Sequence, residues 1–215
     1  MSRRLIALDM DGVLYNITNF WLELHTALGT REEGDRLSKQ YLHTEHDTLW
    51  ELVVNGMWKR KDAQPYFDLI KSIPYMHGIE KLFDYVHNKD WFTCIISGSS
   101  IDGARRIQRD FQVDHIFANY VIIEDGKFTG EWGTPVSSGD ERKAEILRGL
   151  CQDLQIPLEN TIYVGDSKHD VPAIQAVGLG IAFNPADDIV REATPNVIES
   201  TNLRDLVKYL QNHTN

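Results

Sequence analysis

Hydrophobic runs of strand length alternate along the chain with segments in which apolar residues recur every three or four positions. The strand-like runs cover residues 5–8, 91–96, 161–164 and 179–183. The helix-like segments cover residues 77–88, 101–111, 139–154 and 168–177. This alternation predicts right-handed βαβ crossovers, and therefore an α/β fold with a Rossmann-like core: a parallel sheet with helices on both faces.

A long insertion interrupts this alternation after the first strand. Residues 16–75 have helical periodicity, with apolar positions such as Phe20 and Leu24, and lack a strand pattern of comparable strength. We expect a helical cap domain there, over a core domain made of residues 1–15 and 76–215. The aromatic residues of the cap should mainly pack its interior, with one or two lining a substrate pocket: Trp21, Trp50, Trp58, Tyr66 and Phe67. Because the cap follows the first strand directly, it should lie over any site at the end of that strand, although helical insertions can also be merely stabilising.

A shorter insertion lies later in the chain. Residues 120–132 carry Asp125-Gly126 between two apolar runs, a sequence that is typical of a tight β-turn between antiparallel strands. We expect a small β-hairpin without a chemical role.

Size and charge limit the kind of protein this can be. The chain has 215 residues, of which 42% are hydrophobic, and a formal net charge of −10. It is long enough to bury a full core in one domain with an insertion. The negative charge and the lack of a Lys/Arg run argue against nucleic acid and anionic membranes as partners. No apolar run reaches the length of a signal peptide or a membrane span, so we expect a cytoplasmic protein.

Cysteine and histidine residues predict no metal site of their own. Cys94 and Cys151 are the only cysteines and suggest neither a disulfide framework nor a cysteine-based metal site. Among the eight histidines, His43 and His46 are three positions apart in the cap. Because they have few acidic or cysteine companions, they are expected to be surface residues rather than zinc ligands.

Acidic residues follow two of the strand-like runs. Asp9 and Asp11 follow residues 5–8, and Asp166 and Asp170 follow residues 161–164. An isolated Asp-x-Asp is usually a cap or a turn, but the carboxyl ends of parallel strands meet at one sheet edge, where α/β proteins bind ligands. Mg²⁺ prefers oxygen ligands and typically takes one or two carboxylates plus substrate phosphate. The pattern therefore predicts a Mg²⁺ site formed by Asp9, Asp166 and the main-chain carbonyl of Asp11.

Such a site favours phosphoryl chemistry. A bound divalent cation removes the repulsion between a phosphate ester and a carboxylate nucleophile. Asp9 can then attack phosphorus and form an aspartyl phosphate, while Asp11 protonates the leaving oxygen and later activates water. We expect Asp170 to lie outside the metal's own ligands and to orient Lys143 or a metal-bound water.

A small-residue segment is a candidate for binding the phosphate. Ser97, Gly98 and Ser99 follow the run at residues 91–96 and precede a predicted helix. Hydroxyl and main-chain N–H groups at a helix N-terminus can bind an anion, although the same residues also serve as helix caps. Their position at the carboxyl end of a core strand favours phosphate binding.

Four motifs, taken in order, resemble those of the haloacid dehalogenase-like (HAD) phosphatases. They are Asp9-Met10-Asp11-Gly12-Val13-Leu14, Ile95-Ile96-Ser97-Gly98, Lys143 and Gly165-Asp166-Ser167-Lys168-His169-Asp170. Residues 117–119, 125–130 and 178–183 are similar to core segments of the phosphoserine phosphatase branch. The resemblance implies the HAD fold with a C1-type cap, and it implies that Lys143 contacts both Asp9 and the phosphate; from its position alone, Lys143 would be a surface lysine.

The resemblance leaves the substrate open. It suggests a small phosphorylated metabolite, with phosphoserine as one candidate. Thr18 stands where that branch has a glutamate for the substrate amine, and residues 56–61 align poorly with its arginine region. Lys59 and Arg60 could bind a carboxylate, but exposed basic residues usually have no such role. His169 replaces the branch's usual asparagine and can either contact substrate or cap a helix.

The sequence therefore predicts a Mg²⁺-dependent phosphomonoester phosphatase that acts through an aspartyl phosphate, as a monomer or homodimer. A phosphotransferase or mutase, in which the phosphoryl group passes to a second hydroxyl, is one alternative. A sugar-phosphate or nucleotide phosphatase is another. A binding or regulatory protein on the same scaffold is a third, because a fold does not fix a function.

Overall fold

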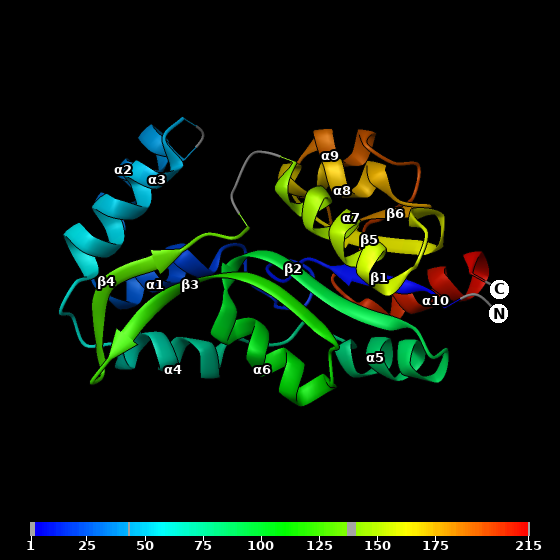
Figure 1. Cartoon of the computed structure of the whole chain (residues 1–215), viewed down its shortest axis with the longest axis horizontal. Helices are drawn as coiled ribbons and strands as arrows, with labels where there is room; N and C mark the ends of the chain where they lie inside the picture. The colour runs from blue at the N-terminus through cyan, green and yellow to red at the C-terminus, as the bar shows by residue number, and fades with distance from the viewer. Residues whose placement is uncertain (1–2, 43, 137–140, 215) are drawn as a thin grey trace.

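A mixed seven-stranded sheet forms the centre of the molecule. The computed structural model describes residues 3–42, 44–136 and 141–214. The strands lie in the order β4-β3-β2-β1-β5-β6-β7 (Figure 1). Their bounds are β1 Leu5–Leu8, β2 Phe92–Ser100, β3 His115–Glu124, β4 Lys127–Gly133, β5 Thr161–Gly165, β6 Leu179–Phe183 and β7 Val197–Ile198. Neighbours pair in parallel except β3 and β4, which confirms the predicted α/β fold with a parallel core.

Helices cover both faces of this sheet. Ile6 and Leu8 of β1 pack into one apolar layer, and Leu5 and Ala7 pack into the other, as the alternation of side chains along a buried strand requires. The first layer contains α5 (Ile79–Asn88), α6 (Ile101–Phe111) and α10 (Leu203–His213). The second contains α7 (Arg142–Leu154), α8 (Val171–Ala176) and α9 (Asp188–Glu192), with single 3₁₀ turns η2 (Leu158–Asn160) and η3 (Lys168–Asp170).

The strand register brings the candidate residues to one edge. Leu8, the last residue of β1, pairs with Ile95 of β2 and Val164 of β5. The loops and strand ends that follow these three positions therefore start at the same level of the sheet.

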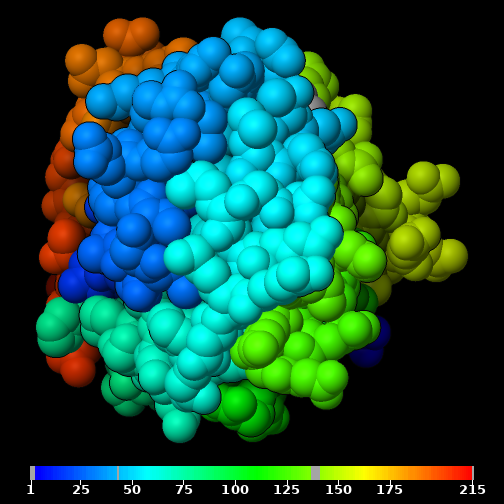
Figure 2. All heavy atoms as spheres, turned by 90° about the vertical axis from the view of Figure 1, so that its left-hand side faces the viewer, coloured from blue at the N-terminus to red at the C-terminus, as the bar shows by residue number. Residues whose placement is uncertain are grey.

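The predicted helical insertion after β1 is confirmed. It comprises α1 (Phe20–Ala27), α2 (Arg31–Tyr41), α3 (His46–Trp50), the π-helix η1 (Glu51–Trp58) and α4 (Gln64–Ser72). We call residues 16–75 the cap. The chain leaves and re-enters the core side by side, because Tyr15 and Tyr75 form an antiparallel bridge and the Asn16 N–H donates to the Pro74 carbonyl at 3.0 Å. Figure 2 shows the cap, in blue and cyan, over much of the face that it draws.

The predicted hairpin is also confirmed, and it supports the cap. Asp125 and Gly126, at φ 48° and 73°, form the tight turn between β3 and β4. The Arg60 N–H donates to the Phe128 carbonyl at 2.9 Å, and the Phe128 N–H donates to the Lys61 carbonyl at 3.2 Å. The hairpin is thereby hydrogen-bonded near its tip to the residues that follow the π-helix. The sequence did not indicate this contact.

None of the helices within the described ranges is both long enough and apolar enough to cross a membrane.

Candidate active site

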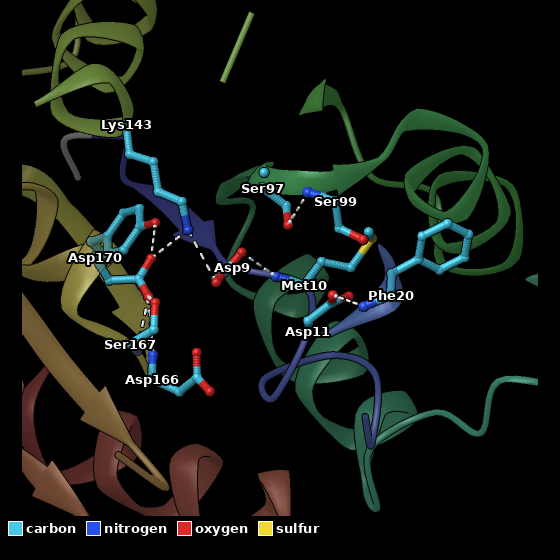
Figure 3. Close-up of polar contacts among 12 residues, drawn as sticks. Asp9, Met10, Asp11, Phe20, Ser97, Ser99, Lys143, Asp166, Ser167 and Asp170 are labelled. Carbon is cyan, nitrogen blue, oxygen red and sulfur yellow. Dashed lines mark hydrogen bonds and ion pairs between the residues drawn. The ribbon is translucent and has the colours of Figure 1, made fainter. Parts of the chain in front are cut away.

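Asp9 and Lys143 form the centre of the site. Asp9 follows β1 and is 6% exposed, and its Oδ1 accepts the N–H of Met10 at 2.7 Å. Lys143 reaches down from the first turn of α7, and its Nζ lies 3.0 Å from Asp9 Oδ2 (Figure 3). Burial raises the pKa of Asp9 to about 6 despite the opposing effect of Lys143. The lysine predicted from the resemblance therefore does lie beside Asp9; whether it contacts phosphate stays a prediction.

Asp170 holds Lys143 in place. It is fully buried, and its Oδ1 receives hydrogen bonds from Lys143 Nζ at 2.7 Å and from the Tyr163 hydroxyl at 2.8 Å. Its Oδ2 accepts the N–H and the hydroxyl of Ser167 at 3.0 and 2.9 Å. Burial alone would raise the pKa of Asp170, but Lys143 and the other donors outweigh it and hold the pKa below its ordinary value. Both oxygens are already engaged, which suits a positioning role better than metal coordination.

Sequence reasoning missed Tyr163. Its side chain is fully buried and belongs to β5, the strand beside β1. In a run of apolar strand residues a tyrosine is indistinguishable from a packing residue. The signal that identifies it, a hydroxyl directed at Asp170, exists only in three dimensions.

A cation site is outlined by the acidic groups at the sheet edge. Carboxylate oxygens of Asp9, Asp166 and Asp170 lie within 4.8 Å of one another. Asp166 is partly exposed, and burial together with the charges of Asp9 and Asp170 raises its pKa to about 9. Gly12 adopts φ 78°, and a Cβ there would overlap the Asp166 carboxylate. The close approach of the two loops therefore depends on Gly12 having no side chain.

The charges and donor atoms at this edge fit Mg²⁺. Within the described part of the chain, Lys143 is the only Lys or Arg that lines the cavity beside Asp9, Asp11 and Asp166. Oxygen ligands and an excess of negative charge are what a hard divalent cation requires.

Asp11 is placed for proton transfer. Its Oδ2 accepts the N–H of Phe20, the first residue of α1, at 2.7 Å. Burial raises its pKa to about 7, against the lowering effect of the Phe20 N–H. Its Oδ1 is buried and receives no hydrogen bond from the residues that the structure describes. A carboxyl group with an intermediate pKa and an unused oxygen is suited to acid–base catalysis.

The serine segment differs from its prediction. Ser97 and Ser99 lie in the last part of β2, which runs on to Ser100 rather than ending at residue 96. Ser100 is the N-cap residue of α6, and its Oγ accepts the N–H groups of Asp102 and Gly103 at 3.2 and 3.4 Å. A register irregularity between Ser97 and Ser100 makes room for this extension. Ser97 and Ser99 therefore line the cavity from a strand end, not from a helix N-terminus.

Two further residues fix the serine segment. The Gly98 carbonyl accepts Trp21 Nε1–H and Asn119 Nδ2–H, both at 2.9 Å. Asn119 is buried on β3, and Trp21 belongs to the cap. Neither was predicted to hold this strand end, since each is far from Gly98 in the sequence.

A cavity of about 290 Å³ opens onto these groups and extends under the cap. Ser97, Gly98, Ser99 and His169 line it together with the acidic residues and Lys143. Trp21, Trp50 and Trp58 line its cap side, so three aromatic residues reach the cavity where one or two were expected.

The basic residues and histidines of the cap that the sequence analysis considered have different outcomes. Lys59 and Arg60 are exposed and do not line this cavity, so the structure does not bring them to the site. His46 is not a surface residue as predicted: it is half-buried, lines the cavity, and accepts Trp50 Nε1–H at 3.2 Å. Its companion in that prediction, His43, lies outside the described residues.

Comparison with known proteins gives consistent matches. The sequence model of the haloacid dehalogenase-like hydrolases matches residues 6–175. A phosphoserine phosphatase of Methanocaldococcus jannaschii is 28% identical over 213 residues, which are 98% of this chain and 99% of the relative. A phosphoserine phosphatase of Saccharomyces cerevisiae is 29% identical over 97% of this chain and 68% of the relative. The solved structure of a substrate-bound phosphoserine phosphatase complex is 26% identical, with a TM-score of 0.84 over 97% of this chain and 99% of that one.

Proposed function

The chain belongs to the haloacid dehalogenase-like hydrolases, and from this premise we propose that it hydrolyses a small phosphomonoester through an aspartyl phosphate on Asp9. The predicted family and enzyme class are confirmed, since relatives that match nearly the whole chain are phosphatases. Phosphoserine is the substrate that the names of these relatives specify, and it is the first compound to test on this protein.

One observation carries the proposal. Asp9 lies at the end of the cavity with one oxygen 3.0 Å from Lys143 Nζ and with carboxylate oxygens of Asp166 within 4.8 Å. A nucleophile, an ammonium for the phosphate charge and a second carboxylate for a cation are thus assembled around one point.

The chemistry follows from the positions of Asp9 and Asp11. An Asp9 carboxylate oxygen bonds to phosphorus, the bond from phosphorus to the ester oxygen breaks, and Asp11 gives its proton to that oxygen. Water then attacks the phosphorus of the aspartyl phosphate and transfers a proton to Asp11. Inorganic phosphate leaves and the Asp9 carboxylate is restored.

The remaining residues bind and orient. We propose that Asp9, Asp166 and the main-chain carbonyl of Asp11 hold Mg²⁺, which when bound neutralises charge on the phosphate. Lys143 balances the developing charge on the phosphoryl oxygens while Asp170 fixes its position. We propose that Ser97, Gly98 and Ser99 contact the phosphate and that His169, at the same cavity, contacts the substrate.

The test measures product and intermediate together. With Mg²⁺ and a panel of small phosphomonoesters that includes phosphoserine, the protein should release phosphate from at least one ester, EDTA should stop the release, and acid-quenched enzyme should carry one phosphoryl group on the peptide that contains Asp9. The Asp9→Asn variant is the control. If the variant is labelled equally, or if wild-type protein neither releases phosphate from any monoester nor acquires the label, the proposal is wrong and a binding role is favoured.

The same assay separates hydrolysis from transfer. Phosphate and alcohol should be released in equal amounts even when glycerol or glucose is added as an acceptor. A deficit of phosphate matched by a new phosphate ester would favour the phosphotransferase or mutase alternative.

We also propose that residues 16–75 act as a cap domain over a core of residues 1–15 and 76–215, and that the protein works in the cytoplasm as a monomer or homodimer. Sedimentation velocity determines the oligomeric state directly.

A further inference from the structure

The part of the cavity under the cap is lined mainly by apolar side chains, with Thr18, Asn19, Ser38 and two histidines beside them. Trp21 and Leu22 come from α1, and residues of α3 and the π-helix form the facing wall. The apolar lining of the cap includes Trp21, Leu22, Leu49, Trp50, Val53 and Trp58. Since Asp11, the proposed proton donor to the leaving oxygen, lines the same cavity, this part is where the leaving group must lie.

The π-helix places its residues for this purpose. Val53 and Trp58 both belong to this helix and both line the cavity. They are five positions apart, which is the spacing of the hydrogen bonds in a π-helix. The helix thus brings a tryptophan ring to the cavity.

Charged side chains do not accompany this lining. Of the described cap residues that line the cavity, none is Asp, Glu, Lys or Arg. Two histidines of the cap, His25 and His46, line it too. Burial lowers the pKa of His25 to about 4, so it is uncharged at neutral pH, and its Nδ1 lies 2.8 Å from Thr30 Oγ1. The Nε2 of His46 accepts Trp50 Nε1–H at 3.2 Å.

We propose that this part of the cavity binds an uncharged, mainly apolar leaving group, so that the substrate is the phosphate monoester of an apolar alcohol rather than of an amino acid. The inference rests on the proposed function, because it takes the phosphate to lie at Asp9. An amino-acid leaving group would lose the hydration of both an ammonium and a carboxylate here without gaining an ionic partner from the cap. The carboxylates at the far end are committed to the metal and to proton transfer.

The arrangement of the tryptophan rings favours a neutral group over a quaternary ammonium. The rings of Trp21 and Trp50 are nearly perpendicular, with centroids 4.9 Å apart, and the rings of Trp21 and Trp58 are inclined at 28°, with centroids 6.2 Å apart. The rings therefore pack against one another, whereas recognition of a cation needs open ring faces around a single point.

A series of n-alkyl phosphates from methyl to pentyl tests the proposal. Their ester bonds have similar intrinsic reactivity, so kcat/KM reports how the leaving group is bound. We expect kcat/KM to rise by about fourfold for each added methylene until the cavity is filled. We also expect butyl phosphate to exceed phosphoserine and phosphoethanolamine by at least about tenfold. A flat series, or phosphoserine at or above butyl phosphate, would overturn the inference.

Charge is tested with a matched pair. Phosphocholine and its neutral tert-butyl analogue have nearly the same shape and differ in the charge of the leaving group. The neutral ester should be hydrolysed with the higher kcat/KM. A preference for phosphocholine would replace the apolar site with a cation site.

Two variants locate the effect. Leu22→Asn introduces an amide into the cavity lining at a half-buried helix position, and Leu52→Asn makes the same change at a cap residue that is 37% exposed and does not line the cavity. The ratio of kcat/KM for butyl phosphate to that for methyl phosphate should fall by about tenfold in Leu22→Asn and stay unchanged in Leu52→Asn. Thermal unfolding establishes that both are folded. An unchanged ratio in Leu22→Asn contradicts the inference.

Binding of n-alkylphosphonates, which cannot be hydrolysed, separates this inference from the proposed function. Calorimetry should give an affinity that rises with chain length. If phosphonate affinity rises with chain length while no ester is turned over, the proposed function fails and the apolar site stands. If phosphoserine is hydrolysed while phosphonate affinity is independent of chain length, the proposed function stands and the apolar site fails.

Discussion

The two ends of the cavity differ in how they are built. At the sheet edge, buried charges are held by specific partners: Lys143 lies between Asp9 and Asp170, and Asp170 also accepts the Tyr163 hydroxyl. At the cap, the lining is mainly apolar, and none of its described residues is Asp, Glu, Lys or Arg. Substituting one member of a paired set leaves its partner unsatisfied, whereas apolar linings tolerate substitutions that conserve volume. The first end should therefore determine whether the reaction occurs, and the second which ester reacts.

Replacing the nucleophile should have the largest effect on activity. Asp9→Asn should lower turnover by at least about a thousandfold, because the amide cannot accept the phosphoryl group. The fold should persist, since the change removes one of several buried negative charges. Phosphate release and thermal unfolding measure the two effects. Asp11→Asn should permit slow phosphorylation of Asp9 at best. Near-normal steady-state turnover in either variant contradicts the assigned roles.

Gly12 tests the approach of Asp166 to Asp9. Gly12→Ala forces a Cβ into the Asp166 carboxylate, and we expect the Mg²⁺ concentration that gives half-maximal activity to rise by about tenfold to a hundredfold. Gly126→Ala is the matched control: Gly126 has a similar φ of 73° but nothing within 4 Å of an added Cβ. Backbone strain alone would affect the two variants alike. An equal response in metal dependence would show that the Gly12 loop does not position Asp166.

Tyr163 tests whether the partners of Asp170 act through Lys143. Tyr163→Phe removes one donor from a buried carboxylate, so we expect a loss of about 1–2 kcal/mol in the free energy of unfolding and a fall in kcat of about tenfold. Tyr209→Phe removes a comparable hydrogen bond, to Asn196 Oδ1 at 2.7 Å, on α10. The control should lose stability without losing kcat. A parallel loss of kcat in both variants would mean that Tyr163 has only a structural role.

The same contrast explains what the sequence could predict. Asp9 and Asp166 were predicted because an acid after a buried strand is a local pattern, and strand topology brings such ends together. Lys143 was predicted only through the family resemblance, since a lysine near the start of an amphipathic helix is usually exposed. These predictions needed only the order of strands and motifs.

The cap end needed information that no local pattern carries. The contact of Trp21 with the Gly98 carbonyl joins residues 77 positions apart. The π-helix that carries Val53 and Trp58 departs from the α-helical period on which the prediction was based. The extension of β2 to Ser100, past a register irregularity between Ser97 and Ser100, likewise depends on pairing with β3. Packing between distant segments, not propensity, decides these features.

Replacing His25 should have the smallest effect on activity, and it tests the cap end of the cavity most directly. Burial lowers its pKa from 6.5 to about 4, so the unfolded chain binds a proton more readily than the folded protein between these values. The stability that neutral His25 contributes is complete above pH 6.5 and is lost as the pH falls towards 4. Between about pH 7 and about pH 4, we expect the free energy of unfolding in urea to fall by up to about 3 kcal/mol more for the wild-type protein than for His25→Gln. The difference arises because glutamine does not titrate. Parallel pH profiles would show that the cap accepts a charge at this position, which would weaken the contrast between the two ends of the cavity.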